Sequence, residues 1–211
     1  MTSQDLRTII LDFDGVLVES NDIKDKAFEA VFAAYPQHLK AIIAYHHSVT
    51  AIRFEKFRYV HEHILHLPYN AAIEKQLGDV FAEFCVAKVS VCPSVRGANE
   101  FLKYFYGRIP LYLVTINPQA DLDIILKNRG LEYYFKGVYP VTGSKQKAIE
   151  QILSVENISK NQALFIGDSQ GDADSAKAAG VEFIGRQSDM VLKDVPVVFD
   201  DMHQVLEQIR G

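Results

Sequence analysis

Two aspartates near the start of the sequence could do chemistry together. Asp12 and Asp14 follow the apolar run Thr8–Leu11, and Gly15 comes next. Carboxylates at the end of a buried strand are costly unless they pair with a cation or bind a metal. An acidic turn completed by Gly15 is the structural alternative, because aspartate and glycine are common turn residues. This stretch alone does not separate the two interpretations.

Polar residues also follow two later apolar runs. Thr115 ends the run Leu111–Val114, and Asp168 comes soon after Ala163–Ile166, with Asp172 four residues further on. The carboxyl ends of parallel strands lie at one edge of a sheet, so these side chains should gather there.

Carboxylates that converge on one point repel each other and require a cation. Oxygen ligands favour a hard ion, and Mg²⁺ binds one or two carboxylates together with a substrate phosphate and water. A metal and positive groups also allow an aspartate to attack a phosphoryl group. The pattern therefore predicts a Mg²⁺ site suited to phosphoryl transfer.

The apolar runs that position these residues alternate with helical segments. The expected strands are Thr8–Leu11, Leu111–Val114, Ala163–Ile166 and Val181–Ile184. The expected helices are Pro93–Tyr106, Gln119–Asn128, Lys145–Leu153, Asp172–Ala179 and Asp201–Ile209. Strands that alternate with helices predict an α/β fold with a doubly wound parallel sheet.

The segment from about Asn21 to Lys88 shows helical periodicity without a clear strand. Phe57, Val60, Ile64 and Leu67 are spaced to lie on one helix face. We expect an α/β core of residues 1–18 and 93–211, with an all-helical insertion over residues 19–92. An insertion after the first strand is placed to act as a lid.

Composition limits the partners of this chain. Its 211 residues are 48% hydrophobic, which is enough for a substantial core, and the formal net charge is −5. This charge argues against general attraction to nucleic acid or anionic membranes. The N-terminus does not resemble a secretory signal, and no stretch approaches the roughly 18 apolar residues of a membrane span. We expect a cytoplasmic protein.

Four ordered motifs resemble the haloacid dehalogenase-like hydrolase superfamily, in the phosphatase branch with an α-helical cap of the C1 type. They are DFDGV at residues 12–16, LVT at 113–115, GSKQKAI at 143–149 and GDSQGD at 167–172. The first and last motifs are the more specific. The resemblance implies a Rossmann-like core, a helical cap and Mg²⁺-dependent hydrolysis of phosphoric monoesters.

The resemblance also implies catalytic roles. Asp12 would be the nucleophile, and Asp14 the general acid that protonates the leaving alkoxide and then activates water. Thr115 would donate to a phosphoryl oxygen. Lys145 would neutralise phosphate charge and hold Asp12, with Lys147 as the competing assignment.

The implied metal ligands are carboxylates and one carbonyl. Asp168 would bind Mg²⁺ together with the Asp12 side chain and the backbone carbonyl of Asp14. Asp172 would be either a further ligand or the carboxylate that orients Lys145, and we favour the second role.

Three residues are candidates for substrate contact. Arg53 and Lys56 share a helix side, and an arginine there could bind a carboxylate or a second phosphate. The alternative is that both are solvated surface charges. Asn117 precedes Pro118, so helix capping competes with substrate contact.

Other functions explain the sequence motifs and the helical insertion less well than a phosphatase does, or equally well in the case of a phosphomutase. The sequence lacks a P-loop, a dinucleotide-binding glycine motif and a nucleophile elbow. A receiver-like signalling module would not explain the helical insertion. Asp14 favours phosphate esters, although a sugar phosphomutase would keep both aspartates.

We expect a small phosphorylated metabolite as substrate, with phosphoglycolate, sugar phosphates and nucleoside monophosphates as candidates. We expect the protein to be a monomer or a homodimer.

Overall fold

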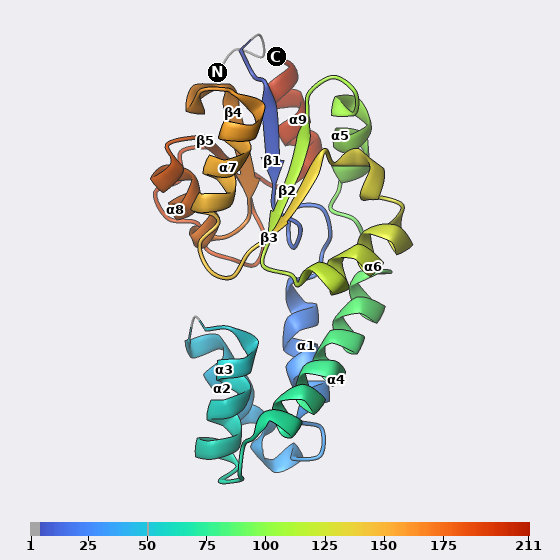
Figure 1. The fold of residues 1–211 in the computed structure, drawn as a ribbon, viewed down its shortest axis with the longest axis vertical. Coiled ribbons are helices and arrows are strands. Elements are labelled where there is room, and N and C mark those ends of the chain that lie inside the picture. Colours follow the sequence, from blue (N-terminus) through green and yellow to red (C-terminus); the bar gives the residue numbers. More distant parts are fainter. Residues whose placement is uncertain (1–4, 50) are drawn as a thin grey trace. The chain divides into compact units, whose positions relative to one another are not determined.

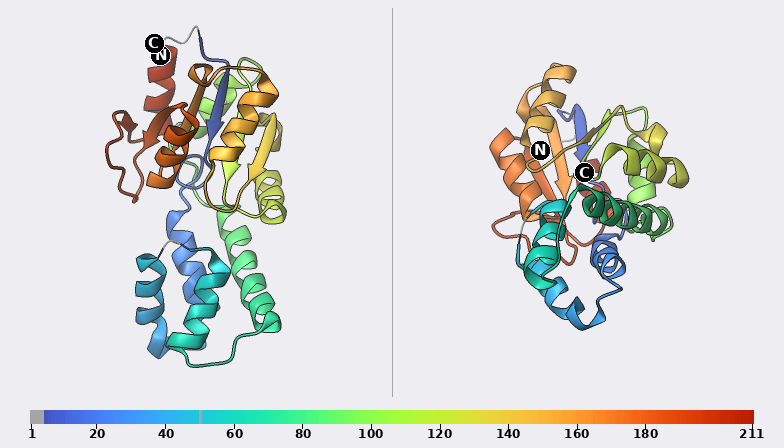
Figure 2. Two further views of the ribbon diagram at one scale, coloured as in Figure 1. Left: turned by 60° about the vertical axis from the view of Figure 1, so that its left-hand side comes forward. Right: turned by 60° about the horizontal axis from the view of Figure 1, so that its bottom comes forward.

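The computed structural model describes residues 5–49 and 51–211, which form two compact units. One unit consists of residues 5–20 and 92–211, and the other of residues 21–49 and 51–91. Residues 1–4 of the first expected core segment lie outside the described residues. The two units differ in architecture (Figures 1 and 2).

A six-stranded parallel sheet forms the centre of the first unit, with strand order β3-β2-β1-β4-β5-β6. The strands are β1 (Thr8–Leu11), β2 (Leu111–Thr115), β3 (Gly137–Pro140), β4 (Ala163–Gly167), β5 (Glu182–Arg186) and β6 (Val198–Phe199). All residues of β1, β2 and β4 are buried, as expected for strands covered on both faces. The predicted α/β class is confirmed.

Helices cover both faces of this sheet. They are α5 (Ala98–Phe105), α6 (Gln119–Arg129), α7 (Gln146–Glu156), α8 (Gln170–Ala179) and α9 (Met202–Arg210), with short 3₁₀ turns at Glu132–Tyr134 and Lys160–Gln162. Helices α7 and α8 pack together on one face, and α5 packs with α9 on the other (Figure 2).

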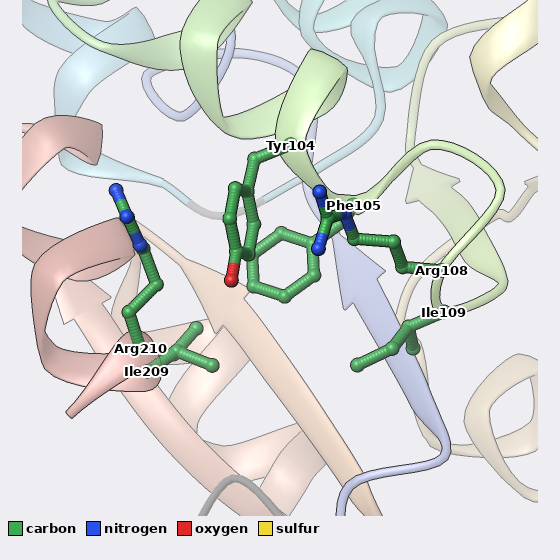
Figure 3. Close-up of a pocket in the computed structure, with 6 residues that line it drawn as sticks. All are labelled: Tyr104, Phe105, Arg108, Ile109, Ile209 and Arg210. Atoms are coloured by element: carbon green, nitrogen blue, oxygen red, sulfur yellow. The ribbon is translucent and has the colours of Figure 1, made fainter.

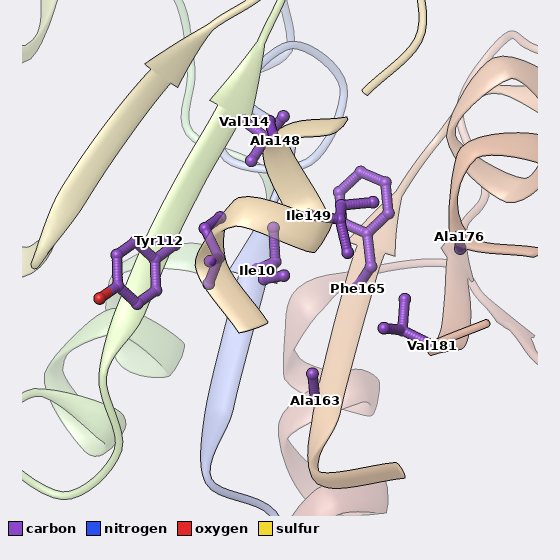
Figure 4. Close-up of a cluster of buried hydrophobic side chains, with 10 residues drawn as sticks. Ile10, Tyr112, Val114, Ala148, Ile149, Ala163, Phe165, Ala176 and Val181 are labelled. Carbon is purple, nitrogen blue, oxygen red and sulfur yellow. The ribbon is translucent and has the colours of Figure 1, made fainter. Parts of the chain in front are cut away.

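Apolar side chains attach α7 and α8 to the central strands. Ile10, Tyr112 and Phe165 of neighbouring strands form a buried cluster with Ile149 of α7 and Ala176 of α8 (Figure 4). Burial of this face fixes α7, which Lys145 immediately precedes, and α8, whose first turn carries Asp172.

Two strands and the starts of α5 and α8 differ most from the expectation. Helix α8 begins at Gln170 instead of Asp172, because Ser169 caps it and Asp172 lies inside its first turn. The apolar pattern did not predict β3 or β6, because β3 begins with glycine and ends with proline and β6 has only two residues. Both lie at sheet edges, where apolar runs are not required. Helix α5 begins at Ala98 instead of Pro93, because Gly97 before it adopts a left-handed conformation with φ of 81°.

The second unit is all-helical. It contains α1 (Asn21–Val31), a 3₁₀ turn (Pro36–His38), α2 (Leu39–Ser48), α3 (Arg53–Tyr59), a π-helical turn η2 (Val60–Ile64) and α4 (Ala71–Val89). Phe28, Phe32, Phe57 and Phe81 form its aromatic centre, with Phe28 5.3 Å from Phe57 and 5.5 Å from Phe81 between ring centroids. Among the described residues, no helix has the length and apolarity needed to span a membrane.

The helix face expected from Phe57 to Leu67 is only partly formed. Phe57 and Val60 are buried, but Leu67 is 36% exposed and lies beyond the last helical residue. The helix widens into η2, and His66 then takes a positive φ of 53°. The periodicity assumed a regular α-helix and missed this widening.

The close approach of Gly97, the residue before α5, to α9 can be tested by substitution. A Cβ atom at Gly97 would lie 2.2 Å from the backbone nitrogen of His203, whereas one at Gly107, with a similar φ of 74°, would meet nothing within 4 Å. We predict that Gly97→Ala lowers the free energy of unfolding by at least about 3 kcal/mol. Gly107→Ala should cost only about 1 kcal/mol, from backbone strain. Urea denaturation measures both, and equal losses would show that the close approach is not rigid.

Candidate active site

Three buried polar residues lie where neighbouring central strands end. Asp12 follows β1, Thr115 ends β2 and Asp168 follows β4, and all three are buried. Because β1 pairs in parallel with both β2 and β4, these residues share one edge of the sheet. The structure thus brings Asp12, Thr115 and Asp168 together.

Lys145 joins two carboxylates at this edge. Its Nζ lies 2.7 Å from Oδ1 of Asp12 and 2.7 Å from Oδ1 of Asp172. The backbone N–H of Phe13 also donates to Oδ1 of Asp12, at 2.7 Å. Lys145 is buried immediately before α7, while the competing Lys147 is exposed.

The two carboxylate oxygens of Asp172 have different partners: one caps α8 and the other contacts Lys145. Ser169, the residue before α8, donates to Oδ2 of Asp172 from its backbone N–H at 3.1 Å and from its hydroxyl at 2.6 Å. The other oxygen, Oδ1, contacts Lys145. A Cβ atom at Gly167 would lie 2.5 Å from that of Asp172, so this turn requires glycine. The capping box therefore fixes Asp172 toward the lysine.

Ser175 connects α8 to the start of α7. Its hydroxyl accepts a hydrogen bond from the backbone N–H of Lys145 at 3.2 Å and donates to the carbonyl of Gly171 at 2.7 Å. Sequence analysis missed this residue, because a serine among small helical residues gives no sign of a partner 30 positions away.

Asp14 occupies a different environment from Asp12. Ser20 donates its hydroxyl hydrogen to Oδ1 of Asp14, and Asn117 donates from Nδ2 to Oδ2 at 2.9 Å. Asn117 also donates its backbone N–H to the Thr115 hydroxyl at 3.2 Å. The helix-capping alternative for Asn117 is wrong, because Pro118 is the residue before α6 and Asn117 contacts Asp14 instead. Ser20 carried no sequence signal.

A buried arginine holds the loop that follows the two aspartates. Arg186, at the end of β5, donates from Nη1 to the carbonyl of Gly15 at 3.1 Å and to Glu19 at 3.0 Å. Its Nε donates to the carbonyl of Asp200 at 3.2 Å. Arg186 thereby fixes the turn at Gly15, and sequence analysis did not identify it.

The electrostatics of the edge combine burial with crowded carboxylates. Burial raises the pKa of Asp12 well above its ordinary value; Lys145 opposes this, and Asp172, Asp168 and Asp14 add to it. Burial lowers the pKa of Lys145, but Asp12 and Asp172 outweigh it and raise that pKa overall. The lysine therefore stays protonated, and burial is the main cause of the raised Asp12 pKa, with carboxylate repulsion second to the opposing effect of Lys145.

The donor set at this edge fits a hard divalent cation. Asp12, Asp168 and Asp172 are buried, and each offers a carboxylate oxygen within 4.8 Å of the others. Buried carboxylates that crowd together need positive charge beyond Lys145, and oxygen ligands suit Mg²⁺. The side chain of Asp14 is held instead by Ser20 and Asn117.

Arg53 and Lys56 lie in the helical unit. The Arg53 guanidinium carbon lies 5.1 Å from the ring centroid of Phe54 and 5.2 Å from that of Phe81. Lys56 is only 8% exposed and donates from Nζ to the carbonyl of His46 at 2.8 Å. The surface-charge alternative is wrong for Lys56, and substrate contact by either residue stays a prediction.

A small pocket of about 170 Å³ lies elsewhere in the α/β unit (Figure 3). Tyr104 stands between Arg108 and Arg210, whose guanidinium carbons lie 4.6 and 4.8 Å from its ring centroid. Ile109, another lining residue, precedes the start of β2. The pocket is therefore at the amino ends of the strands, and none of its lining residues belongs to the predicted site.

Known proteins resemble this chain in both sequence and fold. A family model described as haloacid dehalogenase-like hydrolase matches residues 9–186. The phosphoglycolate phosphatase of Pseudomonas fluorescens (strain Pf0-1) is 28% identical over 113 residues, which cover 51% of this chain and 42% of that protein. The alignment thus spans less than half of the length of this relative.

Solved structures extend the likeness to nearly the whole fold. A predicted phosphoglycolate phosphatase from Haemophilus somnus 129PT superposes with a TM-score of 0.79 at 16% identity, over 97% of this chain and 98% of that one. The HAD-hydrolase YfnB from Bacillus subtilis, bound to magnesium, gives 0.73 at 15% identity, over 98% and 99%. At these identities the structures show a common fold.

The residues matched by the family model run from β1 to the end of β5 and include Asp12, Asp14, Asp168 and Asp172. The chain belongs to the haloacid dehalogenase-like hydrolase family.

Proposed function

We propose that this chain is a Mg²⁺-dependent phosphatase that hydrolyses a small phosphate monoester through a phosphorylated Asp12. The observation that carries the proposal is the difference between two neighbouring aspartates. Asp12 contacts the cation Lys145, whereas Asp14 accepts hydrogen bonds from the uncharged groups of Ser20 and Asn117. A nucleophile needs a nearby positive charge, and a proton-transfer group needs a surrounding that tolerates both of its charge states.

The first half of the reaction transfers the phosphoryl group to the protein. An oxygen of Asp12 attacks phosphorus, and the bond from phosphorus to the ester oxygen breaks. Asp14 gives its proton to the departing alkoxide. Lys145 and the Thr115 hydroxyl stabilise negative charge on the phosphoryl oxygens.

The second half restores the carboxylate. Asp14, now ionised, takes a proton from water as that water attacks the phosphorus of the aspartyl-phosphate. The bond from phosphorus to Asp12 breaks, inorganic phosphate leaves, and Asp14 is again protonated.

Asp12 and Asp168, with the backbone carbonyl of Asp14, would hold Mg²⁺, and Asp172 would either add a ligand or orient Lys145. When bound, the ion supplies positive charge that neutralises the crowded carboxylates and the substrate phosphate.

Phosphoglycolate is our first candidate substrate, because the Pseudomonas relatives carry the name phosphoglycolate phosphatase. It has one phosphate ester and one carboxylate, and we propose that Arg53 contacts the carboxylate. Lys56 and Asn117 are the other candidates for substrate contact.

Replacing Asp12 tests the nucleophile. We predict that Asp12→Asn lowers Mg²⁺-dependent phosphate release from phosphoglycolate and from p-nitrophenyl phosphate by at least about a thousandfold. Asp174→Asn is the matched control, because Asp174 lies on α8, is exposed and bonds to Gln170. Its kcat/KM should equal that of the wild type.

Activity of Asp12→Asn near the wild-type level, or wild-type activity that survives EDTA, would refute this mechanism. Isomerisation of a sugar phosphate in the presence of a bisphosphate activator, without phosphate release, would identify a phosphomutase instead.

Substitutions of Lys145 and Lys147 test which lysine stabilises the phosphoryl group. We predict that Lys145→Met lowers kcat/KM by about a hundredfold or more, because it removes the charge beside Asp12. Lys147→Met should have little effect, because Lys147 is exposed in the first turn of α7. Circular dichroism checks that both variants fold. A larger loss in Lys147→Met than in Lys145→Met would reverse the assignment.

A further inference from the structure

Three metal-binding side chains meet inside the helical unit. Nε2 of His46 lies 3.2 Å from Oδ1 of Asp25, and Nε2 of His47 lies 2.9 Å from the same oxygen. Asp25 belongs to α1, and both histidines belong to the last turn of α2. Each residue offers a ligand atom within 4.8 Å of the others.

We propose that Asp25, His46 and His47 form a second metal site, which takes a borderline divalent transition-metal ion such as Zn²⁺. Zinc bonds to histidine nitrogen and aspartate oxygen at about 2.0–2.2 Å, so ligand atoms around it lie roughly 3.3 Å apart. The two observed separations, 3.2 and 2.9 Å, are close to that spacing. Two imidazoles with one carboxylate also favour zinc over Mg²⁺.

The surroundings already orient one of the ligands. The His46 ring lies 4.0 Å from the ring of Phe28 between centroids, and Nζ of Lys56 lies 3.2 Å from its Nδ1. His47 and Asp25 are more exposed, so an ion and a bound water can reach the open side. Three protein ligands with one solvent position form an open zinc site.

Lys56 opposes the ion without excluding it. A Lys56 ammonium that donates to Nδ1 of His46 places the ring proton on Nε2, which then donates to Asp25. Zinc binding at Nε2 requires that proton to move to Nδ1, where Lys56 now donates. Lys56 keeps a second acceptor, the carbonyl of His46 at 2.8 Å, and can retain it. Removing the Lys56 charge should therefore strengthen zinc binding.

Zinc at this position would join α1 to α2. An ion that binds only the folded state raises the free energy of unfolding. The increase grows with the logarithm of the ratio of ion concentration to dissociation constant. The site would thus make the stability of the helical unit depend on zinc, independently of the carboxylate cluster in the α/β unit.

Calorimetric titration of the full chain with Zn²⁺, in excess Mg²⁺, tests the proposal. We predict that His47→Ala loses one zinc-binding event or weakens it at least tenfold, and that Asp25→Asn does the same. His63→Ala is the matched control, because His63 is an exposed histidine of the same unit, beside Tyr59. Lys56→Met should bind zinc more tightly than the wild type.

Imidazole ¹⁵N NMR shows which histidines bind. Zinc should shift the ring signals of His46 and His47 and leave that of His63 in place. Unchanged His46 and His47 signals, equal zinc binding by His47→Ala and the wild type, or weaker binding by Lys56→Met would overturn the proposal. Neither readout depends on phosphatase activity, so failure here leaves the proposed reaction untouched.

Discussion

The contact of the Lys145 ammonium with Asp12 and Asp172 is the interaction that holds the acidic edge of the α/β unit together. The ammonium lies 2.7 Å from each carboxylate and joins the end of β1 to the starts of α7 and α8. Breaking such a buried pair leaves an uncompensated charge at a typical cost of about 3–5 kcal/mol. The Ser175 hydroxyl accepts from the backbone N–H of Lys145 and donates to the carbonyl of Gly171, and Ser169 caps Asp172. These hydrogen bonds keep the contact in place.

The parallel sheet explains why this costly cluster exists at one place. Neighbouring strands β1, β2 and β4 all end at the same edge, so Asp12, Thr115 and Asp168 gather without any long loop. Burial raises the pKa of Asp12 and the neighbouring carboxylates add to the shift, although Lys145 opposes it. If the site takes a cation and a phosphate, as we propose, its crowded carboxylates destabilise the fold when both are absent. Such a conflict between stability and function is common.

The sequence predicted the features that depend on local pattern. The continuous apolar runs of β1, β2 and β4 identified the central strands, and aspartates at their ends identified the acidic edge. Edge strands β3 and β6 left no such pattern, and the π-helical turn after Phe57 broke a periodicity that looked regular. Ser20, Ser175 and Arg186 could not be predicted, because their partners are set by side-chain geometry in the folded chain.

The central claim is that the phosphoryl group passes through Asp12. Rapid acid quench of the enzyme with phosphoglycolate and Mg²⁺, followed by peptide mass spectrometry, tests it directly. A phosphoryl group should appear on the peptide that contains Asp12 within one turnover and disappear as phosphate is released. Turnover without any phosphorylated peptide, or phosphate on a peptide without Asp12, would contradict the account.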